Sequence, residues 1–333
     1  MDSDQYQIIR NKLAISSEII ITTHYNPDGD AIGSSLALYH FLLGLKCKVS
    51  VIVPNGYPAF LKWLPGNKNI NIYEGNEVFC DALIMRADII FCLDYNALSR
   101  VKLFSDKLLV SKATKILIDH HVDQSNEFDF IHSRISVSST CELLFEFMTG
   151  LGYDNQINKE IAECLYVGIM TDTGSFSYAC NYSQTYEITA SLIKQGIDAE
   201  QIHRSVYDTY SENRMRLLGY CLSDRLVVNL KYKTAYIWLT LNDLVRFNHQ
   251  VGDTEGVVNY ALSIEGVTLA ALFTEQNDRI RISFRSKGDF SVNELAHKHF
   301  VGGGHKNASG GDSFLGIVET LKKFEGLLPI YFG

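Results

Sequence analysis

The sequence predicts an α/β protein made of a parallel sheet with flanking helices and a second, smaller α/β domain. Short, nearly continuous apolar runs alternate with helical patterns over the first 120 residues, and this order is typical of a parallel sheet covered by helices. A second set of strand-like segments begins after about residue 224. At 333 residues, the chain also exceeds the roughly 100 to 200 residues of one typical domain.

Four apolar runs are the expected strands of the first domain. They are "EIIITTH" at 18–24, "KVSVIV" at 48–53, "ADIIFCLD" at 87–94 and "KILID" at 115–119. Their length and continuous hydrophobicity indicate strands that are buried on both faces. The segment "AIGSSLALYHFLLG" at 31–44 has apolar residues spaced by three or four positions, which predicts a helix between the first two strands.

The rest of the chain changes character twice. From about 138 to 223 the pattern is mostly helical, as in "STCELLFEFMTG" and "KEIAECLYVGIM". Beyond it, "RLVVNL", "TAYIWLT", "VTLAALFTEQ" and "RIRISFRS" are predicted strands, with helices between and after them. We therefore predict a first domain at 1–195, a helical linker at 196–222 and a second domain at 223–333.

Composition limits the partners and the compartment. A formal net charge of −8 disfavours broad binding to long DNA or to an anionic membrane surface. The seven cysteines are scattered and form no C-x-x-C pair, so neither a disulfide framework nor a thiolate zinc site is indicated. The first residues, "MDSDQYQIIRNK", lack the basic-then-apolar order that is typical of a signal peptide, and no apolar run of about 18 residues occurs in the sequence. We expect a soluble protein of the cytoplasm.

Residue types that bind metal ions follow three of the four apolar runs. They are His24, Asp28, Asp30, Asp94, Asp119, His120 and His121. In open parallel α/β sheets, residues that follow different strands meet beyond the carboxyl ends of those strands. Clustered carboxylates repel one another unless a cation or a proton compensates them. The pattern therefore predicts a metal site at this edge of the sheet.

Simpler interpretations exist for each segment taken alone. Pro27-Asp28-Gly29 is a good turn signal, and Asp30 can cap the following helix. Asp94 can cap a loop, and one of the two adjacent histidines can be a core residue. The segment "GIMTDTGSFSY" adds Asp172, which a helix cap would also explain. The joint pattern nevertheless favours metal binding, because carboxylates clustered in this way would repel one another strongly without a compensating cation or proton.

Four motifs carry a resemblance to a known family. "NPDGDAIGSS", "LDYN", "DHH" and "TDTGSFSY" occur in this order and resemble the signature motifs of the DHH phosphoesterases. "VGGGHKNASGG" resembles the glycine-histidine motif of the DHH-associated domain. The resemblance covers nearly the whole chain. It implies an N-terminal parallel-sheet DHH domain and a C-terminal DHH-associated domain, with a substrate cleft between them.

The resemblance also implies that two divalent cations are bound by six side chains, which are His24, Asp28, Asp30, Asp94, His120 and Asp172. The first two would bind one cation, Asp94 would bridge both, and the other three would bind the second. Oxygen ligands with an imidazole suit Mn²⁺, with Mg²⁺ or Co²⁺ as substitutes. Two such ions activate a water molecule and clamp the oxygens of an in-line displacement.

Catalytic roles follow for three residues. Asp94 would act as the bridging ligand. Asp119 would orient an imidazole by a hydrogen bond, which fixes the tautomer of that histidine. His121 would either contact the scissile phosphate or transfer a proton to the leaving oxygen, and the sequence leaves both roles open.

Substrate-binding residues are predicted in the second domain. In "RIRISFRSKG", alternation places Ile280, Ile282 and Phe284 on one face of a strand. On the opposite face, the resemblance brings Arg285 near a terminal phosphate, which a guanidinium binds well. The glycine loop that follows offers backbone amides for close approach to phosphate. These expected substrate-binding residues are Arg285, Gly302, Gly303, Gly304 and His305.

The predicted function is that of a Mn²⁺-dependent phosphoesterase acting on short RNA oligonucleotides (nanoRNA), on 3'-phosphoadenosine 5'-phosphate (pAp), or on both. Three alternatives stay open: a phosphodiesterase of cyclic di-AMP or of its linear product pApA, an exopolyphosphatase-like enzyme, and a nucleotide-binding sensor without turnover. Ser177 stands where relatives often have a basic residue, which blurs the substrate assignment. Long DNA and membranes are not expected partners, and a homodimer is left open.

Overall fold

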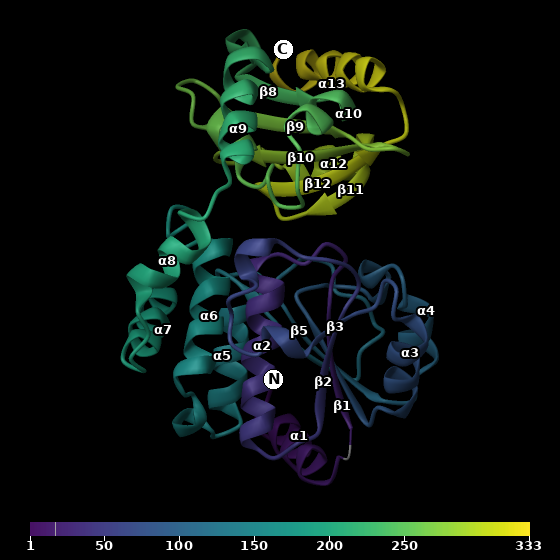
Figure 1. The fold of residues 1–333 in the computed structure, drawn as a ribbon, viewed down its shortest axis with the longest axis vertical. Helices are drawn as coiled ribbons and strands as arrows, with labels where there is room; N and C mark the ends of the chain where they lie inside the picture. The colour runs from purple at the N-terminus through teal and green to yellow at the C-terminus, as the bar shows by residue number, and fades with distance from the viewer. Residues whose placement is uncertain (17) are drawn as a thin grey trace. The chain divides into compact units, whose positions relative to one another are not determined.

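The computed structural model describes residues 1–16 and 18–333, which form two compact units, Met1–Thr209 and Tyr210–Gly333. In Figure 1 the first unit is coloured from purple to teal and the second from green to yellow. Each unit is built on its own six-stranded sheet. Within the described residues, none of the helices combines the length and the apolar character needed to cross a membrane.

The sheet of the first unit is entirely parallel, with the order β3-β2-β1-β4-β5-β6. Its strands are β1 (Ile19–Thr23), β2 (Val49–Val53), β3 (Ile70–Ile72), β4 (Ile89–Leu93), β5 (Thr114–Asp119) and β6 (Phe130–Ser133). The four predicted strands are confirmed and form the centre of the sheet. The two edge strands were not predicted, because they are short and only partly buried and so lack a continuous apolar run.

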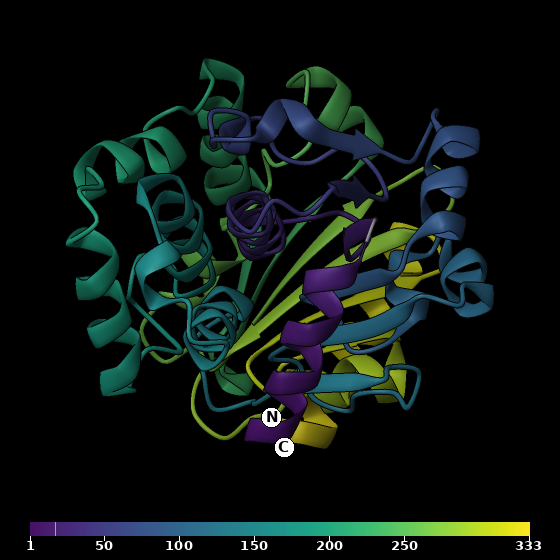
Figure 2. The same ribbon diagram turned by 90° about the horizontal axis from the view of Figure 1, so that it is seen from below.

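Helices cover both faces of this sheet, as the end-on view in Figure 2 shows. Helices α3 (Glu77–Arg86) and α4 (Ser105–Val110) pack on the face that carries Ile20 and Ile90. The face that carries Ile19 and Ile21 packs on α1 (Ser3–Ile15), α2 (Gly29–Gly44), α5 (Thr140–Gly150) and α6 (Lys159–Asp172). Helices α7 (Ser183–Ile193) and α8 (Ala199–Tyr207) pack on α6. Successive residues of one strand therefore enter two separate cores, as expected for a doubly covered sheet.

The second unit has a mixed sheet with the order β11-β12-β10-β9-β8-β7, in which only β8 and β9 are parallel. The strands are β7 (Leu226–Asn229), β8 (Thr234–Leu239), β9 (Leu269–Glu275), β10 (Ile280–Ser286), β11 (Val301–Gly304) and β12 (Ala308–Ser313). Its helices are α9 (Glu212–Asp224), α10 (Leu241–Arg246), α11 (Val257–Leu262), α12 (Val292–His299) and α13 (Ile317–Phe332). Helices α12 and α13 share one core with the sheet, and α9 and α11 share the other. The predicted α/β class of both units is confirmed.

The glycine-rich segment near residue 302 is a strand rather than the predicted loop. Gly302 of β11 pairs with Gly311 of β12 in an antiparallel hairpin. A Cβ atom on Gly302 would lie 2.1 Å from the carbonyl oxygen of Gly310, so only glycine allows the two strands to approach this closely. The segment has no alternating apolar residues, which is why its pattern does not indicate a strand.

Candidate metal centre

Three neighbouring strands bring the predicted ligands to one edge of the first sheet. Strands β1, β4 and β5 are adjacent and parallel, so their carboxyl ends lie side by side. His24 follows β1, Asp94 follows β4, and Asp119 is the last residue of β5, directly before His120 and His121. The convergence expected from the sequence is therefore present in the structure.

Two further carboxylates come from the start of α2. Asp28 is the N-cap of this helix, and its Oδ1 accepts hydrogen bonds from the amides of Asp30 and Ala31, both at 3.1 Å. The cap of this helix is therefore Asp28 and not Asp30, to which the simpler interpretation of the sequence assigned it. The other oxygen, Oδ2, lies 3.8 Å from Nε2 of His24. Asp30 does not cap the helix, and its fully buried carboxylate points elsewhere.

A first group of ligand atoms comes from His24, Asp28 and Asp94. Nε2 of His24 lies 3.4 Å from Oδ2 of Asp94, and the three ligand atoms of the group lie within 4.8 Å of one another. Burial works against a charge on His24, but the nearby carboxylates of Asp28 and Asp94 raise its pKa to about 10. Burial likewise works against ionisation of Asp28, whereas the nearby imidazole of His24 lowers its pKa to about 2.

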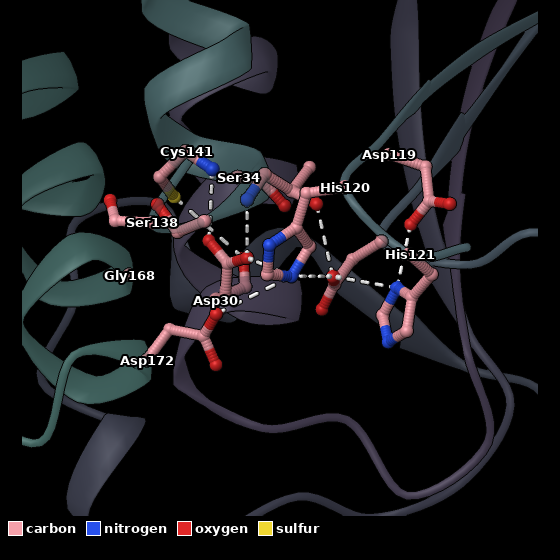
Figure 3. A network of polar contacts seen from close by, with 12 residues as sticks. Asp30, Ser34, Asp119, His120, His121, Ser138, Cys141, Gly168 and Asp172 are labelled. Atoms are coloured by element: carbon pink, nitrogen blue, oxygen red, sulfur yellow. Dashed lines mark hydrogen bonds and ion pairs between the residues drawn. The ribbon is translucent and has the colours of Figure 1, made fainter. Parts of the chain in front are cut away.

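A second group comes from Asp30, His120 and Asp172, again with the ligand atoms within 4.8 Å of one another. Nε2 of His120 lies 3.3 Å from Oδ2 of Asp172 and 3.8 Å from Oδ2 of Asp30. Figure 3 shows these three side chains pointing toward one another. Each group thus offers two carboxylates and one imidazole.

Asp94 lies between the two groups. Its Oδ2 faces His24, while its Oδ1 lies 3.6 Å from Nε2 of His120. The side chain is almost completely buried, and its backbone has a φ of 64°. Aspartate is among the few residues that tolerate this left-handed conformation. The carboxylate therefore presents one oxygen to each group.

The six side chains fit divalent cations because their own charges are not balanced. Burial and the negative charges of Asp94, Asp172 and Asp28 raise the pKa of Asp30 well above its ordinary range. Burial also raises the pKa of Asp94, although its bond to His24 opposes the shift. Bound cations would remove this penalty by holding both groups as carboxylates. The donors are oxygen and imidazole nitrogen, which suit Mn²⁺ or Mg²⁺ and exclude a thiolate site.

The packing of α2 against α6 places Asp172 next to the other ligands of the second group. The start of α2 lies next to the end of α6, where Asp172 is the last helical residue. This contact depends on small residues, because a Cβ atom on Gly168 would lie 2.2 Å from Sγ of Cys141 and 2.8 Å from Oδ1 of Asp30. Gly168 therefore leaves the room that the Asp30 carboxylate occupies.

Asp119 and His121 form a pair close to His120, as Figure 3 shows, and Nδ1 of His121 lies 3.8 Å from Oδ1 of Asp94. The Asp119 side chain is fully buried, and its Oδ1 lies 2.7 Å from Nδ1 of His121. Burial acts against a charge on His121, but the bond to Asp119 raises the pKa of His121. The histidine that Asp119 contacts is therefore His121, a point that the sequence had left open.

The predicted substrate-binding residues all belong to the second unit, whereas the predicted metal ligands all belong to the first. Arg285 lies on β10 and is paired with Ala308, whose carbonyl accepts a hydrogen bond from the amide of His305. Arg285 and the β11–β12 hairpin thus share one end of the sheet. The buried face of β10 carries Ile280, Ile282 and Phe284, as the alternation predicted.

Sequence reasoning missed two residues that contact the carboxylates. The hydroxyl of Thr140 donates to Oδ1 of Asp94, and the amides of Thr140 and Cys141 donate to Asp30. The local signal was the helix start "SSTCE", in which Ser139 caps α5. That signal predicts the start of α5. It does not predict that the first turn of this helix contacts Asp30 and Asp94.

A protein-family model matches part of each unit. The model described as "DHH family, N-terminal domain" matches residues 18–169, and the model described as "DHHA1 domain" matches residues 229–324. The chain is also similar to the bifunctional oligoribonuclease and PAP phosphatase NrnA of Bacillus subtilis (strain 168). The two are 27% identical over 327 residues, which cover 95% of this chain and 98% of that protein.

Two solved structures are similar to this chain. The crystal structure of an exopolyphosphatase-related protein from Bacteroides fragilis is 45% identical, with a TM-score of 0.94 and coverage of 99% of this chain and 97% of that one. RecJ from Thermus thermophilus in complex with Mn²⁺ is 13% identical, with a TM-score of 0.60, and the match covers 99% of this chain and 54% of that one. At this identity, RecJ shows a shared fold only.

Proposed function

Since this chain belongs to the DHH family, with a DHH domain followed by a DHHA1 domain, we propose that it is a divalent-metal-dependent phosphoesterase of short oligoribonucleotides and pAp. The name of the Bacillus subtilis relative, which spans nearly the same length, supports both substrates. The observation that carries the proposal is the orientation of Asp94, which offers one oxygen to each of two ligand groups.

The metal ligands act in two sets that share one carboxylate. His24 and Asp28 would hold one cation, Asp30, His120 and Asp172 would hold the other, and Asp94 would contact both. When bound, such a pair supplies a water nucleophile at neutral pH and positive charge for the phosphate oxygens. Mn²⁺ is the proposed ion, because the ligands are carboxylate oxygens and imidazole nitrogens.

His121 would bind the scissile phosphate. Asp119 accepts the hydrogen bond from Nδ1 of His121, which leaves Nε2 as the second donor of the protonated ring. In the protonated form of the ring, Nε2–H would donate to a phosphate oxygen, and a donor beside the phosphate stabilises the charge that develops there. The same Nε2–H could also protonate the leaving oxygen.

The second unit would hold the part of the substrate distant from the metals. Arg285 offers a guanidinium for a terminal phosphate. The β11–β12 hairpin offers Gly303 for close approach of a ligand, since a Cβ atom there would meet only Oδ1 of Asn293, at 3.5 Å. Gly302 and Gly304 serve the hairpin itself, because a Cβ on either would meet the opposite strand. His305, which follows β11, would add a hydrogen-bond donor to phosphate.

The test is a parallel assay of the full chain with Mn²⁺ against pAp, pApA, cyclic di-AMP, di- to pentanucleotide RNA and polyphosphate. We expect turnover of short RNA and pAp, lost after chelation and lost in Asp94→Ala, which lacks the shared ligand. The matched control is Asp278→Asn on the exposed surface of the second unit, which should keep full activity. Turnover of polyphosphate alone would instead identify an exopolyphosphatase, and nucleotide binding without any turnover would identify a sensor.

A further inference from the structure

Thr140 is the one residue of α5 whose backbone and side chain contact carboxylates of both ligand groups in the described structure. Its hydroxyl Oγ1 donates to Oδ1 of Asp94 at 3.0 Å, and its amide donates to Oδ2 of Asp30 at 2.6 Å. The amide of Cys141 donates to Oδ1 of Asp30 at 2.9 Å. Thr140 is itself fully buried, so these bonds do not compete with solvent.

We propose that Thr140 is a positioning residue that sets the orientation of Asp94 and Asp30 for cation binding, an inference that rests on the metal-dependent function proposed above. The carboxylate of Asp94 must present one oxygen to His24 and the other to His120. The Thr140 hydroxyl bonds the oxygen on the His120 side, which fixes the rotation of the carboxylate about its Cβ–Cγ bond. A carboxylate oxygen has two lone pairs, so one remains for a cation.

The arrangement of α5 supports this role over a purely structural one. Ser139 already caps the helix by accepting a hydrogen bond from the amide of Glu142, so the Thr140 hydroxyl is not needed as a cap. It is also directed at another element, since Asp94 follows β4 and is 46 positions distant in the chain. Hydrogen bonds to metal-ligating carboxylates orient the ligands, and their loss costs about 10- to 100-fold in metal affinity or activity.

The experiment measures Mn²⁺ affinity of the full chain by electron paramagnetic resonance titration, which counts free and bound ions without substrate. Thr140→Val replaces the hydroxyl by a methyl group of similar size. We expect it to weaken Mn²⁺ binding about 10- to 100-fold, while Thr140→Ser, which keeps the hydroxyl, restores most of the affinity. Thr149→Val is the matched control, because Thr149 is on the same helix and its hydroxyl donates to the local carbonyl of Glu146.

The outcomes separate this inference from the proposed function. Equal Mn²⁺ affinity of the wild type and Thr140→Val, with both folded by circular dichroism, would overturn the positioning role alone. A wild type that binds no Mn²⁺ would overturn the proposed function and the positioning role with it. If Thr140→Val does not fold, Thr140→Ala and Thr140→Ser provide the comparison, since both lack the methyl group and differ only in the hydroxyl. Equal affinities of that pair would again overturn the role.

Discussion

Single residues in this protein serve two purposes through separate atoms. Asp28 caps α2 with Oδ1 and faces His24 with Oδ2. Asp94 divides its two oxygens between the ligand groups in the same way. The choice between a cap and a ligand, which each motif alone leaves open, is therefore not exclusive. A carboxylate has enough acceptor positions for both tasks when the backbone holds it between them.

Asp243 in the second unit allows a prediction about acid stability. Burial works against its ionisation, but hydrogen bonds from Arg225, Thr240 and Tyr220 lower its pKa to about 2, from an ordinary value of 3.8. The folded state thus binds this proton less readily than the unfolded state does. Its stabilisation is complete above about pH 4 and is lost as the pH falls toward 2. We expect Asp243→Asn to lower stability at pH 7 by about 1 to 3 kcal/mol. The further loss of stability between about pH 4 and pH 2 should be less steep in this variant than in its parent.

The free energy of unfolding is measured by urea denaturation of the full chain, followed by tryptophan fluorescence. Parent and variants all carry Trp63→Phe. Trp238 then remains as the single tryptophan, and the guanidinium of Arg225 lies 3.9 Å from the centre of its ring. The exposed Asp278→Asn should behave like the parent at every pH. An Asp243→Asn variant whose stability falls between pH 4 and pH 2 as steeply as that of its parent would contradict the assignment.

At the scale of elements, the packing of α2 against α6 brings together Asp30 and Asp172, the two carboxylates of the second ligand group. Glycine and small side chains let the two helices approach closely, and this places the end of α6 beside the start of α2. Strands β4 and β5 contribute Asp94 and His120 from the sheet side. Four elements that are distant in sequence thus define the positions of the second ligand group and of the shared carboxylate.

Gly168→Ala tests this crossing. The new Cβ would lie 2.2 Å from Sγ of Cys141 and 2.8 Å from Oδ1 of Asp30, so α6 or the carboxylate must move. We expect a loss of about 1 to 3 kcal/mol in the free energy of unfolding, as for other overpacked cores, together with weaker Mn²⁺ binding. Thermal melting and a Mn²⁺ titration measure the two effects.

The same substitution at Gly219 is the control. Gly219 lies within α9 and a Cβ there would meet no other atom within 4 Å. Gly219→Ala should therefore stabilise the chain by about 0.5 to 1 kcal/mol, because alanine loses less backbone freedom in a helix. A Gly168→Ala variant that is as stable and binds Mn²⁺ as well as the wild type would show that the crossing is not close-packed.

At the scale of the whole molecule, the chain consists of two units with separate sheets and separate cores. The predicted metal ligands all lie in the first unit. Each unit also holds one of the two tryptophans, Trp63 in the first and Trp238 in the second. Metal binding should consequently stabilise the first unit directly.

Single-tryptophan variants of the full chain can resolve this effect. In Trp238→Phe, the signal of Trp63 reports the first unit, and we expect Mn²⁺ at about 100 times its Kd to add about 2.7 kcal/mol to the stability of that unit. In Trp63→Phe, the urea midpoint reported by Trp238 should stay unchanged. Equal midpoint shifts in both variants would mean that the two units unfold as one cooperative system.

The arrangement of local elements was largely readable from the chain. The four central strands of the first sheet were predicted, because continuous apolar runs of this length are typical of strands buried on both faces. The parallel order then required His24, Asp94 and His120 to meet at one edge. The edge strands β3 and β6 were not predicted because they are short and lack a continuous apolar run. The β11–β12 hairpin was not predicted because its residues carry no hydrophobic period.

By itself, the sequence determined which residue types stand at the strand ends and that the strands there are parallel and buried. Only the tertiary structure decided that Thr140 bonds Asp94, that Gly168 makes room for Asp30, and that Asp119 contacts His121. The reason is physical: hydrophobic periodicity and turn chemistry act over a few residues. Contacts between residues that are 46 or 110 positions apart arise only when helices and strands pack together.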